Sequence, residues 1–247
     1  MKEDVYLCSY PRSGNTWTRL LLSDIFMQCH DIDTNSKNVL ECSDKIIPDE
    51  HCCDINNLDE RIKLPFRIIK THHKFDTRFQ KTIFLFRSPA DSLTSYFHFL
   101  FGTEKIEKKY ENNIDLFVIE KSQEYKRYCE SFLNSQRKDM LFISYESLFE
   151  NAVLSLKRVL SFLNYTTNDT IITKAIDNHT FDKHKGTWKL KTEGNKGGSF
   201  FRKGKIGSSK NELKEETLRN LEKSLMVIHN ELLQIEEKQI KDYYANN

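Results

Sequence analysis

The sequence predicts an α/β fold: a central parallel sheet flanked by helices on both faces, followed by a C-terminal helix. Short apolar segments alternate with amphipathic ones along the 247 residues, a pattern typical of strand–helix units. The first strand, residues 5–8, leads through a polar turn into a helix that begins near Thr16. A later strand, residues 82–86, is followed directly by Arg87, at the strand end where ligands bind in such sheets.

The other elements are predicted from hydrophobic periodicity and turn residues. Strands are expected at residues 5–8, 66–69, 82–86 and 140–143, and helices from about residue 16 and at residues 89–101, 114–136, 147–163 and 168–178. Pro89 suits the first turn of its helix, because a missing N–H costs nothing there. The first helix should present one stripe formed by Trp17, Leu20, Leu21, Ile25 and Gln28.

Two long segments lack this periodicity. Residues 31–65 are polar, and we expect mostly loop with short helical pieces. Residues 180–209 are basic and rich in glycine, and a loop of that length usually has a function.

The last helix, about residues 212–236, repeats apolar residues at steps of three and four. These residues are Leu218, Leu221, Leu225, Ile228, Leu232 and Ile235. The stripe could be a coiled-coil seam between subunits, but fewer than three heptads favour packing onto its own domain. We therefore expect a single domain over residues 1–247, as a monomer or a homodimer.

Composition excludes several classes of protein. The formal net charge is only +2, so nucleic-acid binding has no support. We find neither a targeting segment nor an apolar run long enough for an integral membrane segment, and expect a cytoplasmic protein. The cysteines have no disulfide-framework or zinc-site spacing, so no metal site is expected, even where His51 precedes Cys52 and Cys53.

Residues 10–17, Tyr-Pro-Arg-Ser-Gly-Asn-Thr-Trp, join the first strand to the first helix. The first N–H groups of a helix have no partners, and its dipole favours negative charge there. Gly14 permits a tight turn, Ser13 and Thr16 add hydroxyl groups, and Arg12 suits phosphate oxygens. The segment therefore predicts a site for phosphate or a similar anion. It differs from the nucleoside triphosphate loop, which needs a second glycine and a lysine before Ser or Thr.

Three further groups carry candidate binding or catalytic residues. Arg87 and Ser95, eight positions later, could hold one phosphate. Residues 200–207, Phe-Phe-Arg-Lys-Gly-Lys-Ile-Gly, could fold over another. Lys70 lies two residues before His72, and a histidine at a strand end can act as a general base. Spacing alone does not choose between His72 and His73, and each group could also be an ordinary solvated surface.

Together these segments resemble the sulfotransferase family, which transfers a sulfuryl group from 3′-phosphoadenosine 5′-phosphosulfate (PAPS) to a hydroxyl or amine. The resemblance covers about residues 6–210. Residues 10–17 are similar to the family's 5′-phosphosulfate loop, usually Tyr-Pro-Lys-Ser-Gly-Thr-Thr-Trp. The stretch from Arg87 to Tyr96 resembles its 3′-phosphate motif. Residues 202–207 resemble its Arg-Lys-Gly-x-x-Gly lid, and residues 70–72 match the Lys-Thr-His segment that carries its base.

The resemblance implies a P-loop nucleotide-binding type of fold and a role for each matched residue. His72 would be the catalytic base, assisted by Lys70 and Arg12. The implied donor-binding residues are Arg12, Ser13, Gly14, Asn15, Thr16, Trp17, Arg87, Ser95, Tyr145, Thr180, Phe181, Arg202, Lys203 and Gly204. The product would be 3′,5′-adenosine bisphosphate (PAP), and the reaction would need no metal.

The chain departs from the family pattern at several positions. Arg12 replaces the usual lysine, and because guanidinium stays protonated it can help only electrostatically. Asn15 replaces a hydroxyl residue, and Ser208-Ser209 replaces a common Asp-Trp. The family's Lys-x-x-x-Thr-Val dimer signature is not evident.

We expect in-line transfer, with His72 taking the proton of a small-molecule or carbohydrate acceptor; the polar loops favour a carbohydrate or another polar alcohol. The alternatives are a P-loop kinase or a non-catalytic nucleotide-binding protein.

Overall fold

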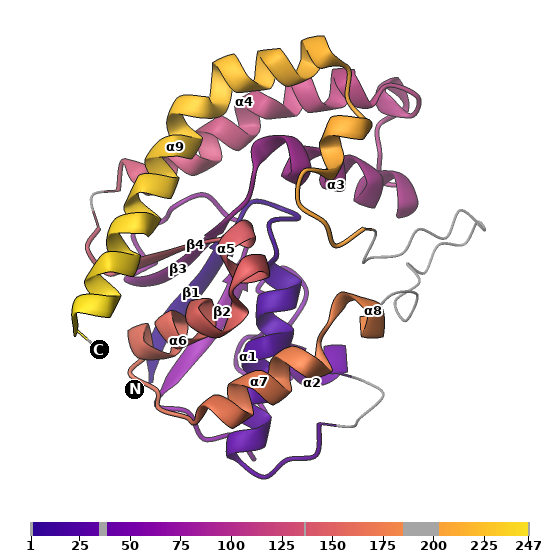
Figure 1. The fold of residues 1–247 in the computed structure, drawn as a ribbon. Coiled ribbons are helices and arrows are strands. Elements are labelled where there is room, and N and C mark those ends of the chain that lie inside the picture. Colours follow the sequence, from indigo (N-terminus) through magenta and orange to yellow (C-terminus); the bar gives the residue numbers. More distant parts are fainter. Residues whose placement is uncertain (1, 35–38, 136, 185–202, 247) are drawn as a thin grey trace.

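The computed structural model describes residues 2–34, 39–135, 137–184 and 203–246 (Figure 1). Its strands form one parallel sheet in the order β2-β1-β3-β4. The strands are β1 (Glu3–Ser9), β2 (Phe66–Thr71), β3 (Lys81–Phe86) and β4 (Met140–Ser144). The predicted fold class is confirmed, and β2 continues through Lys70 to Thr71, beyond the predicted end.

Both faces of the sheet are buried, as in other parallel sheets covered by helices. Successive side chains of each strand enter different cores: Leu7 and Ile83 lie in one cluster, whereas Cys8 and Phe84 lie in the other. The first core is closed by α1 (Asn15–Cys29), α2 (Val39–Ile46), α6 (Ala152–Phe162) and α7 (Asp169–Asn178). The second is closed by α3 (Pro89–Gly102), α4 (Ile114–Leu133) and α9 (Glu215–Asn246), which lie together on the other side of the sheet (Figure 1).

Short elements complete the described part of the chain. They are η1 (Lys108–Tyr110), α5 (Tyr145–Glu150), α8 (Phe181–His184) and η2 (Ser208–Asn211). The helix predicted at residues 147–163 is divided into α5 and α6 at Asn151. This residue leaves helical geometry, with φ −143° and ψ 76°, and its side chain accepts a hydrogen bond from Leu154 N–H. Asn151 thus caps a new helix, an ordinary role for asparagine.

Helix α1 is more enclosed than predicted. In place of one apolar stripe, every residue from Thr18 to Met27 is buried, including the charged Arg19 and Asp24. The helix packs against the sheet and also contacts α2 and α7. Periodicity did not predict this burial, because in a sequence a polar residue with a buried partner cannot be distinguished from one that faces solvent.

Helix α9 extends to Asn246, about ten residues past the predicted end, and its apolar stripe packs within its own chain. Leu221, Leu225 and Leu232 are buried in the second core. Glu236 accepts a hydrogen bond from Ser144 N–H at 2.9 Å and pairs with Arg158 at 3.4 Å. The sequence left two alternatives for this stripe, a coiled-coil seam between subunits and packing onto its own domain, and the structure shows the second. None of the helices in the described ranges is both long and apolar enough to span a membrane.

The strand order creates a switch point between β1 and β3. The chain leaves β1 towards β2 through α1 on one face, and leaves β3 towards β4 through α3 and α4 on the other. A crevice outside the carboxyl ends of two such strands is the common ligand site of open α/β sheets. The loop after β1 and Arg87 after β3 both lie there.

Candidate functional site

The turn between β1 and α1 presents helix N–H groups at the switch point. Arg12 and Gly14 both have positive φ, 69° and 95°. Gly14 is the residue before the helix, makes no side-chain cap, and is followed by a first turn without acidic residues. The positive end of α1 is therefore not neutralised by its own sequence, which favours an anion.

Hydroxyl and guanidinium groups fasten this turn to α3. Arg12 Nε donates to Ser95 Oγ at 3.2 Å, and the Arg12 guanidinium lies 5.2 Å from the centre of the Phe99 ring. Ser92 Oγ donates to Pro11 C=O at 3.0 Å and lies 3.2 Å from Ser13 Oγ. The first two predicted anion clusters therefore come together.

Arg87 lies at the centre of the site. Its guanidinium donates to the backbone C=O of Arg12 at 3.4 Å and of Lys205 at 3.2 Å, and lies 3.7 Å from the Asp91 carboxylate. It also lies 4.2 Å from the centre of the Tyr145 ring. The Nε atom is buried without a hydrogen-bond partner among the described residues. The residue thus connects three separate segments and keeps a donor unused.

Aromatic side chains form a wall beside the turn. The Tyr145 ring packs so closely on Gly14 that a Cβ there would lie 2.8 Å from Cδ2, and its centre is 6.1 Å from that of Trp17. Trp17 Nε1 donates to His179 C=O at 2.9 Å. Phe181 packs on Gly204, where a Cβ would come within 2.2 Å of its ring. These contacts leave no room for a larger residue at either glycine.

The C-terminal segment is held against α3 by Asp91. The carboxylate accepts hydrogen bonds from Gly207 N–H at 2.6 Å and Ser209 N–H at 2.9 Å. Lys203 instead pairs with Glu212 at 2.7 Å. Arg202, the remaining predicted member of this cluster, lies outside the described residues.

His72 lies at the end of β2, next to the end of β1. Its Nδ1 is 2.7 Å from Ser9 C=O, and since a carbonyl only accepts, Nδ1 carries the proton and Nε2 is the basic nitrogen. The Asp49 charge and the hydrogen bond with Ser9 C=O raise the pKa of His72, but burial outweighs them. Burial, reinforced by the Lys70 charge, lowers the pKa of His72 to about 3, which leaves the imidazole neutral near pH 7.

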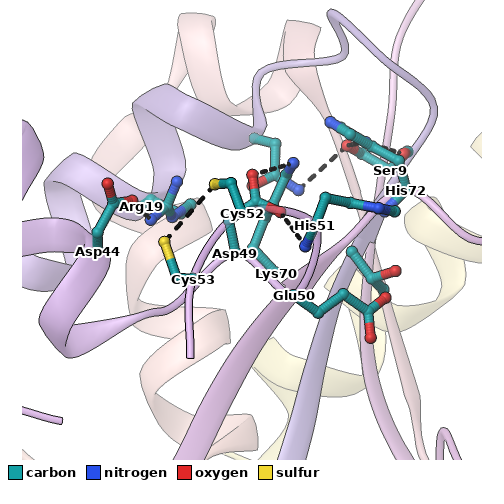
Figure 2. A network of polar contacts seen from close by, with 12 residues as sticks. Ser9, Arg19, Asp44, Asp49, Glu50, His51, Cys52, Cys53, Lys70 and His72 are labelled. Atoms are coloured by element: carbon teal, nitrogen blue, oxygen red, sulfur yellow. Dashed lines mark hydrogen bonds and ion pairs between the residues drawn. The ribbon is translucent and has the colours of Figure 1, made fainter. Parts of the chain in front are cut away.

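Lys70 is directed away from the turn, towards Asp49. The two side chains form a buried ion pair with Nζ 2.6 Å from Oδ2, visible in Figure 2. Burial lowers the pKa of Lys70; it would raise the pKa of Asp49, but the hydrogen bond and charge of Lys70 outweigh burial and lower it. His73 is exposed, and its N–H donates to Thr71 Oγ1.

The structure thus brings most predicted residues to one place and sets others apart. Thr180 is exposed just before α8. Asn15 donates to Leu7 C=O at 3.2 Å and to Ser9 Oγ at 3.1 Å. Asp91 was missed by sequence reasoning, although its place four residues after Arg87, in the first turn of a helix, was a usable signal. No signal in the sequence indicates that Asp91 contacts residues more than a hundred positions away.

Comparison with known proteins gives the class to which this fold and site belong. A family model described as the sulfotransferase domain matches residues 2–234. Sulfotransferase 6B1 of Mus musculus is 28% identical over 222 residues, which cover 84% of this chain and 70% of that protein. The chain belongs to the sulfotransferase domain family, so the predicted resemblance is confirmed.

Solved structures agree on the fold. Mouse sulfotransferase SULT7A1 complexed with PAP superposes with a TM-score of 0.66 at 21% identity, covering 91% of this chain and 85% of that one. Retinol dehydratase in a complex with retinol and PAP gives 0.65 at 19% identity, covering 92% and 82%. The protein is a sulfotransferase of the family that uses PAPS as the sulfuryl donor. This favours the first of the three functions predicted from the sequence over the kinase and the non-catalytic binding protein.

Proposed function

We propose that the protein transfers a sulfuryl group from PAPS to the hydroxyl group of a polar acceptor, with His72 as the general base. The observation that carries the proposal is the convergence of Arg12, Arg87 and the backbone of Lys205 at the start of α1. Segments far apart in the sequence supply these groups. Their shared location at the switch point is the arrangement that a doubly phosphorylated nucleotide requires.

The described residues fit the donor chemically. Arg87 has a buried Nε without a partner among them, and the N–H groups at the start of α1 have no side-chain cap. We assign the 5′ end of the donor to residues 12–17 and the 3′-phosphate to Arg87 and Ser95. Trp17, Tyr145 and Phe181 supply aromatic surface suited to adenine. Bound PAPS supplies the sulfuryl group, and its PAP portion is the leaving group.

We also assign Lys203 and Gly204 to donor binding, but the two residues contribute in different ways. Lys203 pairs with Glu212, so its charge reaches a phosphate only after that exposed ion pair opens. Such pairs contribute about 1 kcal/mol or less, so opening is a small cost. Gly204 contributes its backbone beside Phe181.

The chain's own groups account for the proton and the charge. His72 takes the acceptor's hydroxyl proton on Nε2 while Nδ1–H stays on Ser9 C=O, and the resulting imidazolium gives the proton to solvent after the transfer. Arg12 and the N–H groups of α1 stabilise the negative charge of the leaving phosphate. Lys70 supports this site through Asp49: the ion pair fixes the end of β2, so we assign it a positioning role.

The acceptor is assigned by the surroundings of His72. Ser9 Oγ lies 3.4 Å from His72 Nδ1, and His51 Nε2 accepts a hydrogen bond from His72 N–H (Figure 2). Glu50 precedes His51 on the same loop. Polar groups of this kind hydrogen-bond to additional hydroxyl groups of a substrate better than they pack against a flat apolar ring. A carbohydrate or another polar alcohol is therefore the proposed acceptor class.

The test is a radiolabelled PAPS assay with sugar, phenol, steroid and amine acceptors. We expect turnover with a polyhydroxylated acceptor and a fall in kcat of about 10²–10⁴-fold for His72→Asn, with PAP affinity unchanged. Full turnover by H72N, or loss in His73→Asn alone, would overturn the base assignment. Turnover with phenols only would overturn the acceptor class.

Donor binding is tested separately by calorimetry with PAP and with ATP·Mg²⁺. Arg87→Lys keeps one charge but loses the planar fork, so PAP affinity should fall about tenfold to a hundredfold. Binding of ATP·Mg²⁺ without PAP would contradict the donor assignment.

A further inference from the structure

Glu50, His51 and His73 form a cluster at the carboxyl end of β2, outside the groups assigned to the donor. Each side chain offers one possible metal-ligating atom, and these atoms all lie within 4.8 Å of one another. Residue spacing does not predict this group, because the two histidines come from different loops. A parallel bridge between Asp49 and Lys70 places the loops side by side.

Backbone hydrogen bonds hold the cluster in place. Glu50 N–H donates to Lys70 C=O at 3.1 Å, and His73 N–H donates to Thr71 Oγ1 at 3.0 Å. The Asp49 carboxylate accepts from His51 N–H at 3.0 Å while it pairs with Lys70. The three residues therefore come from anchored backbone, which lowers the cost of gathering ligands.

Two imidazoles and one carboxylate are a ligand set typical of zinc, with room left for water. Glu50 Oε1 is buried and lacks a hydrogen-bond partner among the described residues, which suits it to receive a cation. Donor atoms around zinc lie about 3.3 Å apart, since each bond is about 2.0–2.2 Å long. The His73 side chain is 58% exposed and can rotate to close the remaining gap.

We propose that Glu50, His51 and His73 bind one Zn²⁺ ion. The adjacent thiols are the obvious competing ligands, but Cys52 and Cys53 pair with each other at 3.6 Å between sulfur atoms. Figure 2 shows His51 extending towards His72, and the sulfur atoms on the other side of the loop, towards Arg19. The proposed ligands are nitrogen and oxygen atoms only.

Bound zinc would lie beside the proposed base. His51 Nε2 accepts a hydrogen bond from His72 N–H at 3.2 Å, and the two rings stack 6.0 Å apart. Because a neutral imidazole has one lone pair, a dication held by His51 would displace the hydrogen bond from His72 N–H, and it would crowd the acceptor. Zinc should therefore inhibit sulfuryl transfer, a consequence that rests on the proposed function, whereas zinc binding itself does not.

The test is a calorimetric titration of metal-stripped protein with Zn²⁺. We expect one ion per chain, and a loss of affinity of at least about tenfold for both His73→Ala and Glu50→Gln. Lys74→Ala, a neighbouring exposed change, and the double variant Cys52→Ser/Cys53→Ser should bind zinc like the parent. Far-UV circular dichroism and the unfolding midpoint in chelator verify that each variant folds.

Cobalt(II) substitution separates the two ligand sets. A nitrogen and oxygen site gives visible d–d bands without a thiolate-to-cobalt charge-transfer band. Unchanged affinity in H73A and E50Q, loss of binding in C52S/C53S, or a thiolate band would each overturn the proposal. Because none of these readouts needs PAPS, they stand even if the donor or the acceptor is misassigned.

Discussion

Asp91 Oδ2 lies 2.6 Å from the backbone N of Gly207, and Oδ1 of the same carboxylate lies 2.9 Å from that of Ser209. One side chain in the first turn of α3 thus holds the segment whose Lys205 C=O also accepts from Arg87. Asp91 is 2% exposed, so water cannot replace it. The part of the site that we propose for the 3′-phosphate is therefore held together by a contact between distant parts of the chain.

Replacing Asp91 with Asn should destabilise the protein and weaken PAP binding. The amide offers one acceptor in place of two, so a buried N–H loses its partner, which costs about 1–3 kcal/mol. We expect a lower free energy of unfolding in urea and a lower PAP affinity by calorimetry.

Asp115→Asn is the matched control for that variant. Asp115 also accepts from a backbone N–H of the C-terminal segment, that of Lys214 at 2.9 Å, but the contact is exposed. Its replacement should change stability by about 0.5 kcal/mol or less. Equal effects of D91N and D115N would show that the burial of Asp91 is unimportant.

Glu236 makes a second long-range connection, between α9 and the end of β4. Glu236→Gln breaks the buried pair with Arg158, and removing one partner of such a pair costs about 3–5 kcal/mol. Glu237→Gln, the adjacent change, breaks only the exposed pair with Lys241 and should leave the stability nearly unchanged. Urea unfolding of both variants measures the difference; similar midpoints would contradict it.

His184 should make stability fall in mild acid. Burial, with the charges of His179 and Lys183, lowers its pKa from 6.5 to about 4, so the unfolded chain binds more protons between these values. The contribution of His184 to the free energy of unfolding is fully present above pH 6.5. Below pH 6.5 it decreases by up to about 1.4 kcal/mol for each unit by which the pH is lowered. Asp24 faces His179, and hydrogen bonds that outweigh burial lower its pKa below the ordinary 3.8. Its effect on stability therefore falls at a lower pH than that of His184.

His184→Gln removes this titration and keeps a polar group towards His179. Urea unfolding at about pH 5, 6 and 7 should therefore give a shallower pH dependence for H184Q than for the parent protein. Parallel curves would rule out His184 as the source.

The sequence predicted the sheet and the central part of the site for a physical reason. Each strand is short, apolar and buried on both faces, so its carboxyl end falls at a predictable edge. Arg87 and the turn around Gly14 follow β3 and β1 directly, and neighbouring parallel strands bring them together. Local sequence was sufficient there because the sheet supplies the long-range geometry.

Other features depend on contacts that the chain order hides. The resemblance implies that Lys70 assists catalysis, but Asp49, from the loop that bridges to β2, pairs with it. The approach of His51 to His73 depends on the same bridge. A single sequence does not indicate that a loop forms a β-bridge with an edge strand. The pairing of Lys70 with Asp49 and the approach of His51 to His73 could therefore not be predicted.

Gly14→Ala tests the close packing at the start of α1. At φ 95° any Cβ is strained by about 1–2 kcal/mol, and here it would also lie 2.8 Å from Tyr145 Cδ2. Gly207→Ala is the matched control, because Gly207 also has positive φ, 74°, yet a Cβ there meets nothing within 4 Å among the described residues. G14A should therefore be less stable than G207A in urea and lose more PAP affinity, since displacing Tyr145 also removes the ring beneath Arg87. Equal losses in the two variants would mean that strain alone acts and that the Tyr145 contact does not shape the donor site.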